Sequence, residues 1–323
     1  MIALSKYSLA IIIMFKSLVC ALLVGHAAIV SAVPLGSRHA IVIDELTGGI
    51  LLEKNATDIV PIASVTKLMT AMVVLDAQQD MDEAITIDDA DVDTLKFSSS
   101  RVPVGAVLSR QTLLELALMS SDNRAASALG RAYPGGLGGF RRAAREKAMM
   151  LNMRRTYIKE PTGLSPDNTS TAADLAKLVS AAAKYPEISQ LSTTANDIID
   201  INGNPTEYRN TNRLVGAQDW DIQLSKTGFT HEAGRCLVMR VRSAGRHVIM
   251  VLLNSSASAA RTVDAINLSR FVNGEPAIAA VATRAKRAVR SKRARASARQ
   301  VAKAKAVRKV AGKKAPWIAV ASK

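Results

Sequence analysis

Short β-type runs lie at both ends of the body of this chain, and helical patterns fill the stretch between them. "RHAIVIDELTGGILLE" places two apolar runs, residues 40–43 and 50–52, around a Thr47-Gly48-Gly49 turn, which predicts a hairpin. "DIQLSK", "RCLVMRVR" and "HVIMVLLN" predict three more strands late in the body. Because the apolar face of a sheet must be covered, we expect one antiparallel sheet built from both chain ends, with helices packed on it.

The middle of the body is patterned as helices. From Ser64 onward the apolar residues recur at helical spacing, so we expect a largely buried helix over residues 64–79. Further helical patterns cover residues 110–131, 138–152, 171–184 and 259–271. The sequence therefore predicts an α+β domain over residues 33–274.

The N-terminus is typical of an export signal. Residues 7–32 are almost wholly apolar and end in the small residues Val30-Ser31-Ala32, which predicts a cleaved signal peptide over residues 1–32 and a periplasmic protein. Lys16 interrupts the apolar run, and a start at Met14 would place it in a short basic leader. The competing interpretation is an uncleaved membrane anchor. Removal of Cys20 with the signal would leave Cys236 alone, so no internal disulfide can form.

The net charge of +16 comes from one end of the chain. Residues 276–323 hold fifteen Lys or Arg and no Asp or Glu, which leaves 28 basic and 27 acidic residues elsewhere. We therefore expect a basic, disordered C-terminal tail over residues 275–323. Such a tail either stays solvated or binds polyanions, and after export an anionic lipid or acidic wall polymer is a better partner than nucleic acid.

The stretch "PIASVTKLMT" places Ser64 three residues before Lys67, at the start of the predicted buried helix. Positions i and i+3 share a helix face, so the hydroxyl and the amine can meet. A helix N-terminus favours negative charge at a serine oxygen, and a desolvated lysine can serve as its base. Alone, the pattern is equally explained by a serine helix cap followed by a solvated lysine.

Two more motifs change that balance. "LALMSSDNRAA" places Ser121 and Asn123 just past an apolar stretch, and "QLSKTGFT" places Lys226, Thr227 and Gly228 at the end of a β-type run. Each alone fits a turn or a cap. Together, in this order, they match the Ser-x-x-Lys, Ser-x-Asn and Lys-Thr-Gly set of penicillin-binding proteins and class A β-lactamases.

The resemblance extends over roughly residues 38–273. It is carried by "PIASVTKLMTAMVVLDA", "LLELALMSSDNRAA", "EPTGLSPDN", "STAADLAKL", "RNTNRLV" and "QLSKTGFTHEAGRCLVMR". The chain resembles the serine D-alanyl-D-alanine peptidases among the low-molecular-mass penicillin-binding proteins, and within them the endopeptidases of the penicillin-binding protein 7 type. The resemblance implies a β-lactamase/transpeptidase-like domain over residues 33–274 that acts on peptidoglycan peptide stems and is inhibited covalently by β-lactams.

The resemblance also implies a role for each motif residue. Ser64 would be the nucleophile and Lys67 its base, with Ser121 relaying a proton and Asn123 holding Lys67 and the substrate. On the strand, Lys226 and Thr227 would attract an anionic group, and Gly228 would leave room for substrate. The backbone N–H groups of Ser64 and Phe229 would form the oxyanion hole.

The sequence also bears on three functions other than an endopeptidase. Class A β-lactamases use a Glu-x-x-x-Asn loop, but Leu164 stands four residues after Glu160, which disfavours rapid β-lactam hydrolysis. A D-alanine carboxypeptidase needs the same catalytic residues, so the motifs leave it open. A polyanion-binding protein with a decayed enzyme domain is disfavoured because every motif residue is present. The four histidines lack metal-ligand spacing, so neither a metal nor another cofactor is expected.

Overall fold

The structure is a computed structural model that describes residues 33–278. The predicted signal peptide and nearly all of the basic tail lie outside these residues. Within the described part, no helix is both long enough and apolar enough to span a bilayer.

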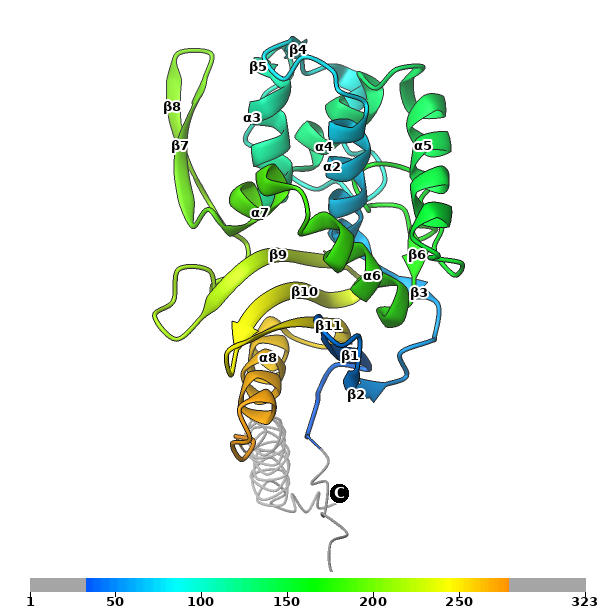
Figure 1. The fold of residues 1–323 in the computed structure, drawn as a ribbon. Coiled ribbons are helices and arrows are strands. Elements are labelled where there is room, and N and C mark those ends of the chain that lie inside the picture. The colour runs from blue at the N-terminus through cyan, green and yellow to red at the C-terminus, as the bar shows by residue number, and fades with distance from the viewer. Residues whose placement is uncertain (1–32, 279–323) are drawn as a thin grey trace, which may run out of the picture. The chain divides into compact units, whose positions relative to one another are not determined.

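A five-stranded antiparallel sheet forms the base of the domain (Figure 1). Its order is β2 (Ile50–Lys54), β1 (His39–Asp44), β11 (Arg246–Ser255), β10 (Gly234–Ser243) and β9 (Asp221–Thr230). β1 pairs with β11 from His39 opposite Leu253 to Asp44 opposite Val248. The predicted hairpin, the three late strands and their union in one sheet are thus confirmed, and β9 is an edge strand.

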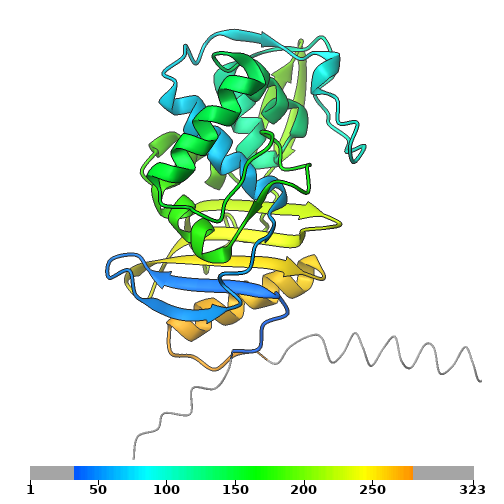
Figure 2. The same cartoon turned by 90° about the vertical axis from the view of Figure 1, so that its right-hand side faces the viewer.

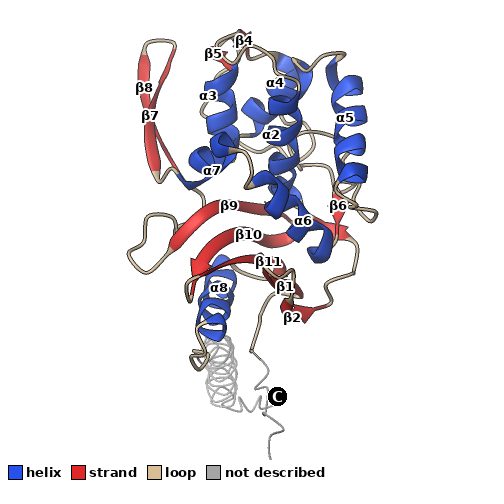
Figure 3. Ribbon diagram, viewed as in Figure 1, coloured by secondary structure: helices blue, strands red, loops and turns tan. Residues whose placement is uncertain are grey.

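Helices cover both faces of this sheet, as Figure 3 shows in blue. One face carries α2 (Thr66–Asp76), α3 (Arg110–Glu115), α4 (Asn123–Arg131), α5 (Gly136–Met150), α6 (Ala172–Ala182) and α7 (Pro186–Thr193), and the other carries α8 (Ser258–Val272). α2 is buried on all sides from Thr66 to Val74, which makes it the central helix of the cluster.

Short elements complete the described domain. They are β3 (Val60–Pro61) with β6 (Thr169–Ser170), β4 (Ala84–Thr86) with β5 (Val107–Ser109), β7 (Asn196–Ile201) with β8 (Asn204–Arg209), the 3₁₀ turns η1 (Ala63–Val65) and η2 (Asp89–Asp91), and the π-helical turn η3 (Leu116–Ser120). The β7–β8 hairpin projects beside the helical cluster in Figure 1 and was not predicted from the sequence.

The single helix predicted over residues 110–131 was wrong. The chain leaves the helical path at Ser121, whose φ is +61°, and Asp122 then caps α4 by accepting from the Ala125 N–H at 3.0 Å. The apolar spacing continues through the break, so periodicity alone did not reveal it. The break places Ser121 and Asn123 at a corner between two helical segments.

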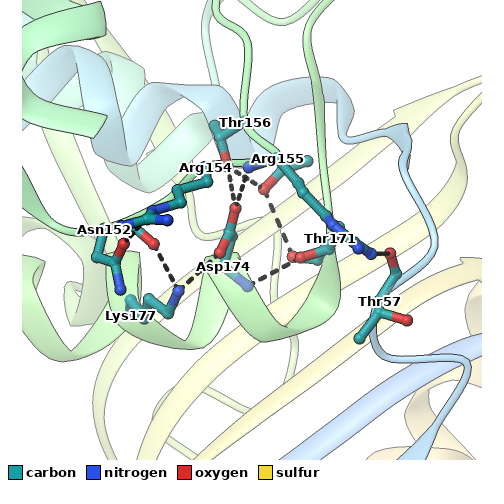
Figure 4. A network of polar contacts seen from close by, with 9 residues as sticks. Thr57, Asn152, Arg154, Arg155, Thr156, Thr171, Asp174 and Lys177 are labelled. Carbon is teal, nitrogen blue, oxygen red and sulfur yellow. Dashed lines mark hydrogen bonds and ion pairs between the residues drawn. The ribbon is translucent and has the colours of Figure 1, made fainter. Parts of the chain in front are cut away.

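A buried carboxylate fixes the start of α6 (Figure 4). Asp174 accepts hydrogen bonds from the Arg155 N–H at 2.9 Å and the Thr156 hydroxyl at 3.1 Å, and it pairs with Lys177 at 2.9 Å. Thr171 caps the helix by accepting from the Asp174 N–H at 3.0 Å. These bonds hold the chain that follows α5 against α6, and so set where the next loop, residues 159–168, begins.

Candidate active site

The turn η1 carries Ser64 and is held between two glycines. A Cβ at Gly163 would lie 2.0 Å from the Ala63 carbonyl oxygen and 2.8 Å from the Ser64 nitrogen. A Cβ at Gly228 in β9 would lie 3.1 Å from the same nitrogen. Ala63 itself has a φ of +48°, an uncommon conformation for a residue with a side chain. Gly163 must therefore be glycine for the chain to approach Ser64 this closely, and at Gly228 a side chain would force its neighbours to shift.

The predicted helix start at Ser64 is shifted slightly. Ser64 lies in the 3₁₀ turn and α2 begins at Thr66, with the Ile62 N–H donating to the Asn168 carbonyl at 3.1 Å. The amide of Asn168 also donates to the Thr66 hydroxyl at 3.1 Å. Asn168, fully buried, therefore ties the residues 159–168 loop to the beginning of α2 on either side of Ser64.

The amine of Lys67 lies at the centre of the site. Its Nζ is 3.1 Å from Ser64 Oγ, 2.8 Å from Asn123 Oδ1 and 2.7 Å from the Thr162 carbonyl oxygen. Lys67 is 1% exposed. Burial lowers its pKa to about 8, and the charge of Glu160 is the largest opposing influence. An appreciable fraction of the Lys67 amine is therefore neutral near pH 8 and able to accept a proton from Ser64.

A chain of polar contacts extends from Lys67 to the loop between η2 and β5. Asn123 donates through Nδ2 to Ser98 Oγ at 2.7 Å, and Ser98 Oγ donates to Asp93 Oδ2 at 2.7 Å. The motif predicted Asn123 but not Ser98, which has no recognisable spacing to it in the sequence. This loop therefore fixes the side-chain amide that contacts Lys67.

Glu160 has its carboxylate fully engaged by its own loop. Oε2 accepts from the Thr162 N–H at 2.6 Å and the Thr162 hydroxyl at 2.6 Å, and Oε1 accepts from the N–H groups of Gly163 at 2.7 Å and Ser165 at 3.2 Å. These hydrogen bonds hold the backbone of Thr162 in place, and its carbonyl oxygen accepts from Lys67. A carboxylate so occupied lacks the free lone pairs of a water-activating base.

β9 brings the third motif against Ser64. Lys226 is buried, and burial, then repulsion from Lys67 and Arg261, lowers its pKa well below the ordinary lysine value. Its Nζ donates to the Thr227 carbonyl at 3.1 Å. The Thr227 hydroxyl donates to Thr211 Oγ1 at 2.6 Å, and Thr211 follows the unpredicted β7–β8 hairpin. Two buried amines and the guanidinium of Arg261 therefore lie close enough on this side of the site to influence one another's protonation.

The remaining predicted residues lie around this centre. Phe229 follows Gly228 in β9 and is 44% exposed, with the Arg235 guanidinium 3.6 Å from its ring centroid. Ser121 is partly buried at the corner before α4, and its hydroxyl makes no hydrogen bond to another side chain among the described residues. The structure thus joins Ser64, Lys67 and Asn123 by direct contacts and brings Gly228 against them, whereas no hydrogen bond joins Ser121 to Lys67.

Chemically, this arrangement provides a serine hydroxyl beside an amine of lowered pKa, backbone N–H groups at a turn, and a second buried amine on the neighbouring strand. Such a set suits acyl transfer through a covalent intermediate. Two further contributors, Thr162 and Thr211, contact the site from loops distant in sequence.

Known proteins share this architecture. The family model described as D-alanyl-D-alanine carboxypeptidase matches residues 26–257. The D-alanyl-D-alanine endopeptidase of Pseudomonas aeruginosa is 44% identical over 256 residues, covering 78% of this chain and 83% of that protein. The D-alanyl-D-alanine endopeptidase of Escherichia coli is 44% identical over 241 residues, covering 74% and 77%. A penicillin-binding protein of Listeria monocytogenes, solved with ampicillin bound, gives a TM-score of 0.64 at 29% identity and covers 74% of this chain and 98% of its own.

These similarities confirm the resemblance inferred from the motifs, and the shared fold confirms the β-lactamase/transpeptidase-like class. The match spans the sheet, the helical cluster and all three motifs. The chain belongs to the D-alanyl-D-alanine carboxypeptidase family of serine-type D-Ala-D-Ala peptidases.

Proposed function

We propose that this protein is a penicillin-binding serine peptidase that hydrolyses D-alanyl peptide bonds in peptidoglycan cross-links, a DD-endopeptidase. The observation that carries the proposal is the 3.1 Å contact between Ser64 Oγ and the Nζ of Lys67, a buried amine whose pKa burial lowers to about 8. A serine next to a base of this pKa can be deprotonated as it attacks a carbonyl.

In the acylation step, Ser64 Oγ attacks the carbonyl carbon of a D-alanine residue while Lys67 takes the hydroxyl proton. The oxyanion is stabilised by the backbone N–H groups of Ser64 and Phe229. The C–N bond then breaks, and Ser121 relays the proton from Lys67 to the leaving amine. Water hydrolyses the resulting ester and frees Ser64 for another cycle.

The other motif residues position these groups. Asn123 accepts from Lys67 at 2.8 Å and offers its amide to the substrate backbone. Lys226 lies close enough to Lys67 for the charge of Lys67 to lower the pKa of Lys226. With the hydroxyl of Thr227, the Lys226 amine offers hydrogen bonds to a carboxylate on the leaving side. Gly228 lets the substrate lie along the edge of β9.

An endopeptidase is preferred to a carboxypeptidase that trims pentapeptides. Both relatives at 44% identity are named endopeptidases, whereas the description of the family model names a carboxypeptidase. The catalytic residues are common to both activities, so the difference must lie in how the site receives the leaving group beyond the scissile bond.

A β-lactamase is disfavoured because Glu160 is occupied by four hydrogen bonds from its own loop. Without a free carboxylate to activate water, the penicilloyl ester on Ser64 should hydrolyse slowly. Penicillins then act as covalent inhibitors rather than as substrates.

The test compares the wild type with Ser64→Ala on cross-linked muropeptide dimers and on uncross-linked pentapeptide monomers, with products separated by chromatography and identified by mass. We expect wild type alone to convert dimers into monomers. Loss of one D-alanine from pentapeptides with intact dimers would assign a carboxypeptidase instead. Activity or penicillin labelling retained in Ser64→Ala would refute the assignment of the nucleophile.

The cellular location completes the proposal. Peptidoglycan lies outside the cytoplasmic membrane, so we place the mature protein in the periplasm after removal of residues 1–32. The charge of residues 275–323 supports a tail that holds the enzyme near anionic lipid or acidic wall polymer.

A further inference from the structure

One carboxylate near the site has no role in the mechanism proposed above. Asp93 lies in the loop of residues 93–98, and Figure 2 shows the stretch that contains this loop, in cyan, descending at one side of the helical cluster toward the sheet. Its Oδ1 accepts from the N–H groups of Leu95 at 2.8 Å and Lys96 at 2.9 Å. Its Oδ2 accepts from the N–H of Ser98 at 2.8 Å and from the Ser98 hydroxyl at 2.7 Å.

These hydrogen bonds keep Asp93 ionised. Burial would raise the pKa of Asp93, but the hydrogen bonds from the Ser98 hydroxyl and from the backbone N–H groups outweigh it, so the pKa lies below the ordinary value. Asp93 is therefore a carboxylate throughout the range in which the amine of Lys67 titrates. An ionised carboxylate accepts hydrogen bonds and donates none.

The direction of the hydrogen bonds between Asp93 and Lys67 follows from this. Ser98 gives its one hydroxyl proton to Asp93, so Ser98 Oγ must accept from Asn123, whose Nδ2 is 2.7 Å away. The amide of Asn123 therefore turns Nδ2 toward Ser98 and Oδ1 toward the Nζ of Lys67, at 2.8 Å. An amide has two ends of similar shape, and without Ser98 either end could face Lys67.

The direction of the Asn123 amide decides where the lone pair of neutral Lys67 points. Among the described residues Nζ makes three polar contacts, at 2.7 Å with the Thr162 carbonyl oxygen, at 2.8 Å with Asn123 Oδ1 and at 3.1 Å with Ser64 Oγ. A neutral amine has two protons and one lone pair. The carbonyl oxygen and Oδ1 can only accept, so they take both protons and the lone pair faces Ser64. A reversed amide would donate to the lone pair and leave a proton facing Ser64.

We propose that Asp93 is a positioning residue that, through Ser98 and Asn123, holds the lone pair of neutral Lys67 toward Ser64. This inference rests on the proposed function, in which Lys67 takes the proton of Ser64. No hydrogen bond joins Asp93 to Lys67 within residues 33–278, so Asp93 acts through the direction of the intervening hydrogen bonds.

The test measures the second-order rate of Ser64 labelling by a fluorescent penicillin from pH 6 to pH 10, in the wild type and in Asp93→Asn. The new amide at position 93 can donate to Ser98, so the hydrogen bonds can reverse. The maximal rate at high pH should fall about tenfold, because a neutral amine that faces Ser64 with a proton cannot act as a base. The charge of Asp93 also raises the pKa of Lys67. Loss of that charge alone would move the midpoint to lower pH and leave the maximal rate unchanged, and this result would overturn the proposal.

Two further variants separate positioning from construction of the loop. Ser98→Ala removes the hydroxyl but keeps the charge of Asp93 and the three hydrogen bonds that Asp93 accepts from backbone N–H groups. It should lower the maximal rate as much as Asp93→Asn does, the double variant should be no slower than either, and a wild-type rate in Ser98→Ala overturns the proposal. If circular dichroism shows that Asp93→Asn is unfolded, Ser98→Ala carries the test.

Asp44→Asn is the matched control. Asp44 accepts through Oδ1 from the N–H groups two and three residues later, as Asp93 does, but its strand β1 is separated from β9 by two other strands. Asp44→Asn should label Ser64 at the wild-type rate. A loss as large as that in Asp93→Asn would mean that any broken turn of this kind slows labelling, and it would overturn the proposal.

A substitution at position 123 gives the sharpest comparison. Asn123→Asp alone leaves two carboxylates that compete for the one hydroxyl proton of Ser98, so labelling should slow. Adding Asp93→Asn restores one direction: the amide at position 93 donates to Ser98, and Ser98 donates to the carboxylate at position 123, which accepts from Lys67. Asp93→Asn should therefore slow labelling in the wild type and speed it in Asn123→Asp. Slower labelling in both would mean that Asp93 only builds the loop, and would overturn the proposal. A wild type that is not labelled at Ser64 would overturn the proposed function together with this inference.

Discussion

The protonation of Lys67 should control the rate at which Ser64 is acylated. With a pKa of about 8, roughly one-tenth of the Lys67 amine is neutral at pH 7, about half at pH 8 and about nine-tenths at pH 9. If only the neutral amine can take the serine proton, the acylation rate constant should rise about tenfold from pH 7 to pH 9. An ordinary lysine, by contrast, would still be almost wholly charged at pH 9.

The assay is the second-order rate of labelling by a fluorescent penicillin, measured from pH 6 to pH 10. Lys226 also has a lowered pKa, so the midpoint must be assigned to one amine. Asp122 raises the pKa of Lys67 by its charge, and it caps α4 through Ala125. Asp122→Asn keeps a capping side chain and removes the charge, so the midpoint should move to lower pH.

A rate that is flat from pH 6 to pH 9 would refute the role of Lys67 as the base. So would a midpoint near 10, which would mean that burial does not lower its pKa. An unchanged midpoint in Asp122→Asn would assign the titration to another group. Circular dichroism across the same pH range controls for loss of structure.

Three more predictions concern the fold, the acyl-enzyme and the tail. Gly163→Ala should lower the free energy of unfolding by about 2–5 kcal/mol, because the new Cβ clashes with Ala63 and the φ is strained. Gly203→Ala is the control: its φ is similar but nothing lies within 4 Å, so it should lower the free energy of unfolding by only about 1 kcal/mol. Equal decreases for the two variants in denaturant unfolding would contradict the packing argument. The penicilloyl form of Ser64 should persist on intact-mass measurement, and rapid hydrolysis of a chromogenic cephalosporin would show that water is activated by some other group. Truncation after Gly274 should reduce sedimentation with anionic liposomes and sacculi, and unchanged sedimentation would exclude tethering by the tail.

The strands and their union in one antiparallel sheet were predictable because they rest on local patterns, whereas the order of the strands came only from the structure. In the runs around Thr47-Gly48-Gly49 and in the late β-type runs, apolar residues either alternate with polar ones or follow one another for several positions, and both patterns indicate strands. The β7–β8 hairpin escaped prediction, although Asn202-Gly203 at its turn is a strong hairpin signal. Its strands expose most of their side chains, so no apolar pattern drew attention to them.

The site was predictable only where residue types and spacing carry the chemistry. The contact of Ser64 with Lys67 follows from their separation of three residues. Ser98, Thr162 and Thr211 could not be found in this way, since each reaches its partner from a different loop, 25, 95 and 16 residues away in sequence. Thr162 and Thr211 lie in stretches that carry the family resemblance, "EPTGLSPDN" and "RNTNRLV", but nothing in those stretches indicates which partner either residue contacts.

The pairing of β1 with β11 has a consequence for the way the domain folds. His39 and Leu253 are neighbours in the sheet although 214 residues separate them in the chain. Loop closure over that distance is entropically costly and slow, so β1 can join the sheet only after β11, the last strand, is available to pair with it. We expect the nascent polypeptide to lack its completed sheet until synthesis has passed Ser255. A chain that completes its sheet this late stays unfolded for longer, and that delay would help the export proposed above, because a channel admits an unfolded chain more readily than a folded domain.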